Sequence, residues 1–235
     1  MVGLGPGGEE TLTPQARDAI SGADVVIGYS TYIKLAKPYL TNQTVLSSGM
    51  KKETDRARVA VEEALAGKRV AVISSGDPGV YGMASPILEI APPELEVDVI
   101  PGVTAATATA AVLGAPLTHD FAVISLSDLL TPWETILRRL EAAAAADFVI
   151  VLYNPRSHGR DQHLEVARNV VLKHRAKETP LGLVKDCCRA GEAKQVTTLG
   201  DMNIEDVDMT TTVIIGNSQT KVLNGRMITP RGYVI

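Results

Sequence analysis

The sequence predicts two α/β domains, the first built on a parallel sheet and the second on a mixed sheet. Short β-branched runs alternate with amphipathic segments along the 235 residues, which is typical of strands joined by helices. The run at 70–73 is apolar throughout, as expected of a strand that is covered on both faces. After residue 180, short strand-like runs and glycine turns replace the helical periodicity, so the second half is expected to be rich in strands.

The first half begins with a very short strand at 2–4 that leads directly into glycines. Thr13 and Pro14 form a helix start, with Thr13 as the N-cap and Pro14 at the first helical position, and Gly22 ends that helix. Hydrophobic spacing predicts further strands at 25–27, 45–46, 70–73 and 97–100, and helices at 34–40, 54–66 and 104–113. Arg56 and Arg58 in the 54–66 helix are interpreted as part of a solvated face.

The segment 114–120, which contains Pro116, is the best candidate for a boundary between domains. We therefore expect a parallel α/β domain at 1–115 and a mixed α/β domain at 120–235. Strands are expected at 121–125, 148–152, 181–184, 195–198 and 212–215, and helices at 133–146 and 162–174.

Charge and composition exclude several classes of function. The net charge of −4 argues against a nucleic-acid binder, whose footprint is usually basic. No apolar stretch approaches the roughly 20 residues that span a bilayer, and no secretory leader is visible, so a cytoplasmic protein is expected. The only cysteines, Cys187 and Cys188, are adjacent and are interpreted as packing residues rather than as a disulfide. No metal site is expected, because the histidines are scattered: His119, His158, His163 and His174.

The opening loop, Gly3-Leu4-Gly5-Pro6-Gly7-Gly8, has the spelling of a dinucleotide-binding fingerprint. Its context differs, because four residues intervene before the helix cap at Thr13. The acid that such a site needs after the second strand is also missing, since Gly28 and Tyr29 stand there. The loop is therefore either a tight turn or a ligand-facing loop, and a nicotinamide site is disfavoured.

Two more loops in the first half follow strands at their carboxyl ends, where ligands of open α/β sheets bind. The 74–82 loop holds three glycines and Pro78, which let a ligand approach the backbone closely, and Asp77 could meet a cationic ligand or cap a helix. The 101–105 loop opens a helix with Thr104 as a plausible N-cap. The amides of that first turn could instead hold a carboxylate.

The second half has polar loops at 125–128 and 153–157, each after a strand. If the two domains face each other, these loops and the glycine loops of the first half line one cleft.

Together, these motifs resemble the tetrapyrrole methylase family along essentially the whole chain. The Gly3-to-Gly7 loop, Gly76-Asp77-Pro78 and Pro101-Gly102-Val103-Thr104-Ala105 stand in the family's order and spacing. The resemblance implies two α/β domains with S-adenosylmethionine in the cleft between them, usually in a homodimer. By that analogy the cofactor contacts fall at Pro6, Gly76, Asp77, Val80, Thr104, Ala105, Tyr153, Asn154, Gly191 and Thr212.

The reaction implied by the resemblance is methyl transfer to C-17 of a corrin-pathway tetrapyrrole, coupled to ring contraction. The substrate would be precorrin-3B or its cobalt-containing counterpart, and the sequence leaves that choice open. The attacking carbon is electron-rich, so the protein has mainly to align carbon, methyl and sulfur, and positioning supplies a large share of such a rate.

One departure from the family concerns acid–base chemistry. A sister enzyme, the uroporphyrinogen methylase, places an aspartate after the second strand, where this chain reads Gly28-Tyr29-Ser30. Tyr29 is the nearest substitute, as a hydrogen-bond donor to the substrate, and a packing role for its ring is the alternative. For the carboxylates of the macrocycle, Arg156 and Arg160 are the first candidates, followed by Lys51 and Lys52. Ser127 and Asp128 complete the expected substrate contacts.

Three other functions compete with this interpretation. A methylase of the same fold could act in the siroheme or diphthamide pathway. A nicotinamide-dependent reductase would need the acid that Gly28 and Tyr29 do not provide. A non-catalytic tetrapyrrole carrier would not need every cofactor loop.

Overall fold

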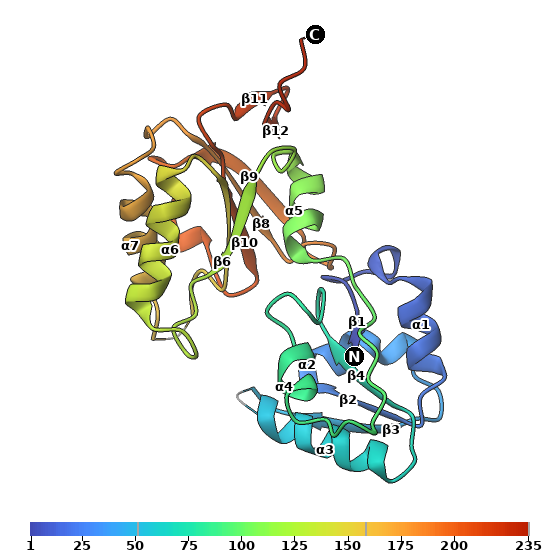
Figure 1. Cartoon of the computed structure of the whole chain (residues 1–235). Coiled ribbons are helices and arrows are strands. Elements are labelled where there is room, and N and C mark those ends of the chain that lie inside the picture. Colours follow the sequence, from blue (N-terminus) through green and yellow to red (C-terminus); the bar gives the residue numbers. More distant parts are fainter. Residues whose placement is uncertain (51, 158, 235) are drawn as a thin grey trace. The chain divides into compact units, whose positions relative to one another are not determined.

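The computed structural model describes residues 1–50, 52–157 and 159–234 of the chain. The chain divides into two compact units, Met1–Ala105 and Ala106–Ile235 (Figure 1). This boundary lies before the helix at 104–113 rather than at 114–120, where the sequence places it. None of the helices in the described part of the chain is long and apolar enough to cross a membrane.

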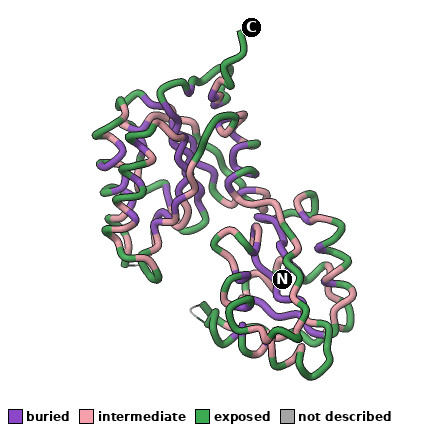
Figure 2. Tube along the Cα trace, viewed as in Figure 1, coloured by how far each residue is buried: buried purple, intermediate pink, exposed green. Residues whose placement is uncertain are grey.

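The first unit contains a four-stranded, fully parallel sheet in the order β1-β4-β2-β3. The strands are β1 (Val2–Gly3), β2 (Val25–Tyr29), β3 (Thr44–Ser48) and β4 (Val70–Ser74). All four were expected from the apolar runs, and the parallel pairing of the first half is confirmed. Buried residues run along β1, β2 and β4, whereas β3, at the edge of the sheet, has only exposed and half-buried residues (Figure 2).

Helices cover both faces of this sheet. Neighbouring residues of a strand point to opposite sides, so one strand contributes side chains to the core on each face. Ala71 and Ile73 of β4 belong to a core with Ile20 of α1 (Pro14–Ser21). Val72, between them, belongs to a second core with Ala57 of α3 (Glu53–Leu65) and Ile87 of α4 (Ala84–Leu88). The apolar run at 70–73 is thus explained.

The predicted start of α1 is confirmed. The Thr13 hydroxyl accepts a hydrogen bond from Ala16 N at 3.1 Å, and Pro14 occupies the first turn. The helix predicted at 34–40 begins earlier, as α2 (Ser30–Ala36), and continues as a 3₁₀ turn at Lys37–Tyr39. Pro38 has no amide to donate, which explains why the α-helical pattern stops there.

The strand predicted at 97–100 does not form. Only Ile100 makes a bridge, to Val2, because β1 spans two residues and offers little edge to pair with. The solvated face predicted for α3 is also wrong at one position, since Arg56 is buried. Its guanidinium donates to Ser48 Oγ at 2.9 Å and to the Gly49 carbonyl at 2.8 Å, and it pairs with Glu53.

The second unit is built on a five-stranded mixed sheet in the order β6-β7-β10-β8-β9. The first pair is parallel and the other three pairs are antiparallel, which confirms the mixed sheet. The strands are β6 (Phe121–Ser125), β7 (Val149–Tyr153), β8 (Pro180–Lys185), β9 (Ala193–Thr198) and β10 (Thr211–Ile215).

Helices α6 (Trp133–Ala145) and α7 (His163–Val171) cover one face of this sheet, and α5 (Ala105–Leu113) lies on the other (Figure 1). Gly182 of β8 leaves room for the side chain of Leu113, which explains why α5 packs with the second unit. A small sheet, which was not predicted, joins β11 (Lys221–Leu223), β12 (Arg226–Ile228) and β5 (Gly114–Ala115).

Three loop backbones pack against each other beyond the carboxyl ends of β1 and β4. A Cβ on Gly3 would lie 2.6 Å from Gly102 N and 2.8 Å from the Gly76 carbonyl oxygen. A Cβ on Gly102 would lie 2.9 Å from Cα of Gly3. The atoms in the way are all backbone atoms, so no side-chain rotation relieves the clash. Glycine is required at both positions for this reason.

We therefore expect Gly102→Ala to lower the free energy of unfolding by about 3 kcal/mol, toward the upper end of the usual cost of overpacking. Chemical denaturation measures the effect. Gly49→Ala is the matched control, because no atom lies within 4 Å of a Cβ at that position. Equal stability of the two variants would contradict the close packing of these loops.

Candidate functional site

The glycine loops of the first unit are joined by a short antiparallel bridge. Gly76 N donates to the Gly5 carbonyl at 2.7 Å, and Gly5 N donates to the Gly76 carbonyl at 3.1 Å. Both residues have positive φ angles, 73° at Gly5 and 66° at Gly76, which favour glycine. Pro6 is buried directly beside Gly5. The bridge therefore brings together two of the predicted cofactor contacts, Pro6 and Gly76.

Asp77 holds this cluster of loops in place. Its Oδ1 accepts a hydrogen bond from Gly79 N at 2.8 Å, and its Oδ2 accepts one from Gly102 N at 3.0 Å. One carboxylate thus connects the 74–82 loop to the 101–105 loop. Charge-assisted bonds of this kind are stronger than neutral ones. Asp77 is a positioning residue in this geometry, and its direct contact with the cofactor stays a prediction.

The turn after Asp77 presents Val80 at the edge of the first unit. Val80 N donates to the Asp77 carbonyl at 3.2 Å, and Ala84 N donates to the Pro78 carbonyl at 3.0 Å. Val80 is half-buried, whereas Tyr81 is 60% exposed and has a φ of 55°. The backbone around Val80 is therefore fixed by local hydrogen bonds before any ligand arrives.

Tyr29 ends strand β2, at the same edge of the sheet as these loops. Its ring packs edge-on against Tyr32, with the centroids 5.3 Å apart, so the packing role left open by the sequence is present. Tyr29 pairs in register with Ser48 of β3, whose hydroxyl is bound by Arg56. Sequence reasoning missed Arg56, although Glu53 three positions earlier was a usable signal, because residues at that spacing meet on a helix.

In the second unit, the carboxyl ends of β6 and β7 lie side by side, with Ser125 in register with Tyr153. The Asn154 amide donates to Ser125 Oγ at 2.9 Å, and Ser127 N donates to the same oxygen at 3.2 Å. Asn154 has a φ of 52°, which asparagine tolerates better than most residues. Three predicted site residues, Ser127, Tyr153 and Asn154, are thus brought together.

The first turn of α5 is bound by the protein itself. The Tyr153 hydroxyl accepts a hydrogen bond from Ala106 N at 2.6 Å. The helix begins at Ala105, so Thr104 occupies the N-cap position that the sequence predicts. One amide that was expected to face a ligand carboxylate is therefore already bonded to Tyr153.

Asp128 and Arg160, two of the predicted substrate contacts, lie near each other. The Asp128 carboxylate pairs with His163 Nε2 at 3.1 Å. The Trp133 ring packs against the His163 ring, with the centroids 4.2 Å apart and the planes tilted by 51°. Partial burial opposes ionisation of Asp128, but the hydrogen bond from His163 and the charges of His163 and Arg160 outweigh it and lower the pKa. Arg160 donates to Ser157 Oγ at 2.8 Å and to the Leu126 carbonyl at 3.4 Å.

Arg156, the first candidate for binding a substrate carboxylate, is engaged elsewhere. Its Nη2 lies 3.1 and 3.0 Å from the two carboxylate oxygens of Glu205, and its Nη1 donates to the Ile204 carbonyl at 3.1 Å. Lys52 pairs with Asp55 at 3.2 Å, and Lys51 lies outside the described residues. A substrate carboxylate at Arg156 would have to displace Glu205.

The last two predicted cofactor contacts lie elsewhere in the second unit. Gly191 is exposed in the loop between β8 and β9, with a φ of 92° and no atom within 4 Å of an added Cβ. Thr212 is buried in β10 and pairs with Val184. No hydrogen bond between described residues joins either of them to the Ser125–Asn154 pair.

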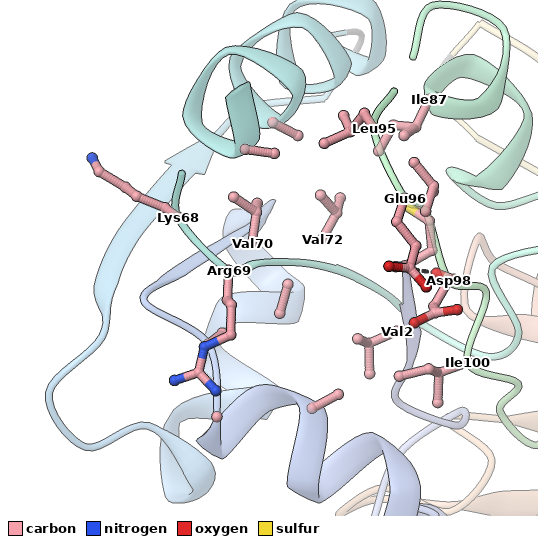
Figure 3. Close-up of a pocket in the computed structure, with 18 of the residues that line it drawn as sticks. Val2, Lys68, Arg69, Val70, Val72, Ile87, Leu95, Glu96, Asp98 and Ile100 are labelled. Atoms are coloured by element: carbon pink, nitrogen blue, oxygen red, sulfur yellow. Dashed lines mark hydrogen bonds between the residues drawn. The ribbon is translucent and has the colours of Figure 1, made fainter. Parts of the chain in front are cut away.

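A cavity of about 430 Å³ in the first unit lies away from these loops. It is lined by Met1, Lys68, Arg69 and Val70, which stand where β1 and β4 begin. Figure 3 shows Lys68 and Arg69 on one side of it and Glu96 and Asp98 on the other. Because ligands of α/β sheets bind at the carboxyl ends of strands, we assign this cavity no role in catalysis.

The glycine loops fit a cofactor that is held by backbone groups. A Cβ built on Gly76 has no neighbour closer than 3.9 Å, so its absence leaves an open strip of backbone. The amides and carbonyls of Gly5 and Gly76 bond to each other, which fixes this strip of backbone in place. S-adenosylmethionine, with a sulfonium, an amino-acid end and a flat adenine, matches such groups.

Three comparisons place this geometry among known proteins. A probable cobalt-factor III C(17)-methyltransferase of Salmonella typhimurium is 50% identical over 238 residues, covering 100% of this chain and 99% of that protein. The crystal structure of the methyltransferase CobJ superposes with a TM-score of 0.93 at 38% identity, over 97% of this chain and 98% of that one. A uroporphyrin-III C-methyl transferase from Thermus thermophilus, complexed with S-adenyl homocysteine, shares the fold with a TM-score of 0.67 at 23% identity, over 92% and 95%.

The family model of the tetrapyrrole (corrin/porphyrin) methylases matches residues 1–203, which include both strand-end loop clusters. The resemblance seen in the glycine loops is therefore confirmed, and the chain belongs to the tetrapyrrole (corrin/porphyrin) methylase family.

Proposed function

We propose that this protein transfers a methyl group from S-adenosylmethionine to C-17 of a corrin-pathway tetrapyrrole, with contraction of the ring. The cobalt-bearing substrate is our first choice. The observation that supports it is the 50% identity, over the whole chain, to a protein named for cobalt-factor III. Metal-free precorrin-3B is the second candidate.

In this reaction, the role of the protein is to position the cofactor and the substrate relative to each other. Bound S-adenosylmethionine supplies an activated methyl group on a positively charged sulfur, which departs as a neutral thioether. Asp77 fixes the 74–82 loop against the 101–105 loop, so that the backbone groups near Gly76 are set before the cofactor binds. In the second unit, Asn154 and Ser125 fix the loop that follows β7. Preorganisation of this kind lowers the entropic cost of alignment.

The substrate brings carboxylates that need hydrogen-bond donors. Near the end of β6, Arg160 and Ser127 are our candidates for binding these carboxylates. Arg156 becomes available to donate to the substrate when Glu205 is displaced. Asp128 pairs with His163 of α7, and this contact ties the 125–128 loop to the start of that helix. Tyr29, at the end of β2, is proposed as a hydrogen-bond donor to the macrocycle.

We also propose that the protein is a homodimer and that it is located in the cytoplasm. The family resemblance implies a homodimer of the 24.9 kDa chain, and sedimentation velocity measures the mass of the particle. The cytoplasmic location expected from the sequence belongs to the same proposal.

Anaerobic incubation with S-adenosylmethionine tests the reaction. We expect cobalt-factor III to gain one methyl group by mass spectrometry, and precorrin-3B to react much more slowly. Methylation of precorrin-3B alone would reverse the choice of substrate. If neither compound reacts while the protein binds the cofactor, the proposed reaction is wrong and the family remains.

Asp77→Asn keeps the shape of the side chain but leaves one acceptor for the two amides of Gly79 and Gly102. We expect the Kd for S-adenosylhomocysteine to rise about tenfold, which corresponds to the loss of one charge-assisted bond. Calorimetric titration measures it. Asp55→Asn, on the exposed side of α3, is the control and should bind normally. An unchanged Kd in Asp77→Asn would remove this loop from the cofactor site.

Tyr29→Phe removes one hydroxyl and retains the ring that packs on Tyr32. We expect kcat to fall about tenfold or more while the Kd for S-adenosylhomocysteine stays the same, since the lost donor acts on the substrate. Stopped assays and calorimetry separate the two effects. Equal activity of the two proteins would leave Tyr29 with the packing role alone.

A further inference from the structure

The two cysteines of the chain and one carboxylate meet in the loop between β8 and β9. Cys187 is buried, Cys188 is half-buried and Glu192 is exposed. One ligand atom from each lies within 4.8 Å of the other two. The sequence suggested packing residues and no metal site, because the loop geometry that brings Glu192 back to the cysteines is not visible in the spacing.

The distance between the sulfurs suits a shared metal ion. Cys187 Sγ and Cys188 Sγ are 3.8 Å apart. Two Zn–S bonds of about 2.3 Å at a tetrahedral angle place their sulfurs about 3.8 Å apart. The same distance allows a hydrogen bond between the two thiols, whereas a disulfide needs about 2.05 Å, so the free sulfurs are spaced for chelation and not for a disulfide.

The backbone of this loop is turned so that neighbouring side chains converge. Asp186 and Cys188 have φ values of 47° and 59°, which residues other than glycine adopt at a cost. Arg189 N donates to the Asp186 carbonyl at 2.9 Å, and Glu192 N donates to the Arg189 carbonyl at 3.0 Å. Glu192 Oε2 accepts a bond from Cys188 N at 2.8 Å, which holds the carboxylate over the cysteines. The loop is preorganised without any ligand.

We propose that this loop is a binding site for a thiophilic divalent cation of the Zn²⁺ or Co²⁺ type, with Cys187, Cys188 and Glu192 as ligands. Binding forms two metal–sulfur bonds and one metal–oxygen bond. The two thiol protons pass to solvent, and no oxidation occurs. Three protein ligands leave a fourth position for water. Mg²⁺ and Ca²⁺ are disfavoured, because they take oxygen ligands.

The inference rests on these three residues alone and does not require the proposed reaction. Burial raises the pKa of the Cys187 thiol to about 12, so that thiol is protonated at neutral pH and the metal must displace its proton. Because the chain has two cysteines in all, every thiolate signal reports on this loop.

The test uses the reduced, metal-free full-length protein under anaerobic conditions, titrated with Zn²⁺ and in parallel with Co²⁺. We expect one equivalent of Zn²⁺ to protect both thiols from a thiol reagent, and one equivalent of Co²⁺ to give a sulfur-to-metal charge-transfer band. Cys188→Ser should abolish that band. Glu192→Gln should weaken Zn²⁺ binding more than tenfold, and Glu165→Gln, an exposed residue of α7, should leave it unchanged.

Two outcomes would overturn the proposal. The thiols could react equally fast with and without one equivalent of Zn²⁺. Alternatively, the metal could bind while the Co²⁺ spectrum lacks the sulfur band, which would place the metal on nitrogen or oxygen ligands. Circular dichroism checks that Cys188→Ser is folded. Glu192→Gln changes an exposed side chain, so the test stands even if the cysteine variant misfolds.

Discussion

The close packing of three backbones, at Gly3, Gly76 and Gly102, is the constraint on which the first unit's site depends. Side chains are excluded at Gly3 and Gly102, because the Gly76 carbonyl and other backbone atoms already occupy their space. The Asp77 carboxylate then fixes two of the loops by accepting one amide from each. Of the opening glycines, which spell a dinucleotide-binding motif, Gly3 is explained by this packing, and Gly5 has a positive φ and bridges to Gly76. Helix α1 starts at Pro14, so its N-terminus is not part of the glycine loop.

The second unit arranges its site by a different means, since its polar side chains bind one another. The Tyr153 hydroxyl accepts a hydrogen bond from an amide of α5. The Asn154 amide donates to Ser125, and the Arg156 guanidinium donates to Glu205. A ligand that takes the place of one of these partners therefore replaces a hydrogen bond that the protein already makes. Such exchanges contribute little net free energy but determine geometry strongly. The site is consequently better suited to orienting a substrate than to holding it tightly.

What the sequence predicted correctly was local. The Thr13 cap, the strands that precede the 74–82, 125–128 and 153–157 loops, and the parallel first sheet follow from spacing over a few residues. The failures have distant causes. The 97–100 segment lacks a long partner strand, α5 belongs to the second unit because Leu113 fits over Gly182, and Arg156 meets a carboxylate 49 positions away. The burial of Arg56 depends on Ser48 and Gly49, which lie on a different strand end.

Substrate affinity must come mainly from contacts that the free protein does not already make. Near the candidate loops, large apolar side chains are exposed: Tyr81 is 60% exposed in the first unit, and Leu129 and Leu130 are 59% and 92% exposed in the second. In either unit, covering such a side chain with part of a ligand removes apolar surface from water, which is favourable at roughly 25 cal/mol per Å². Polar groups that are already paired then select the orientation in which few of their bonds are lost. In the second unit, this division of roles accounts for strand-end loops whose polar side chains already bind partners within the protein.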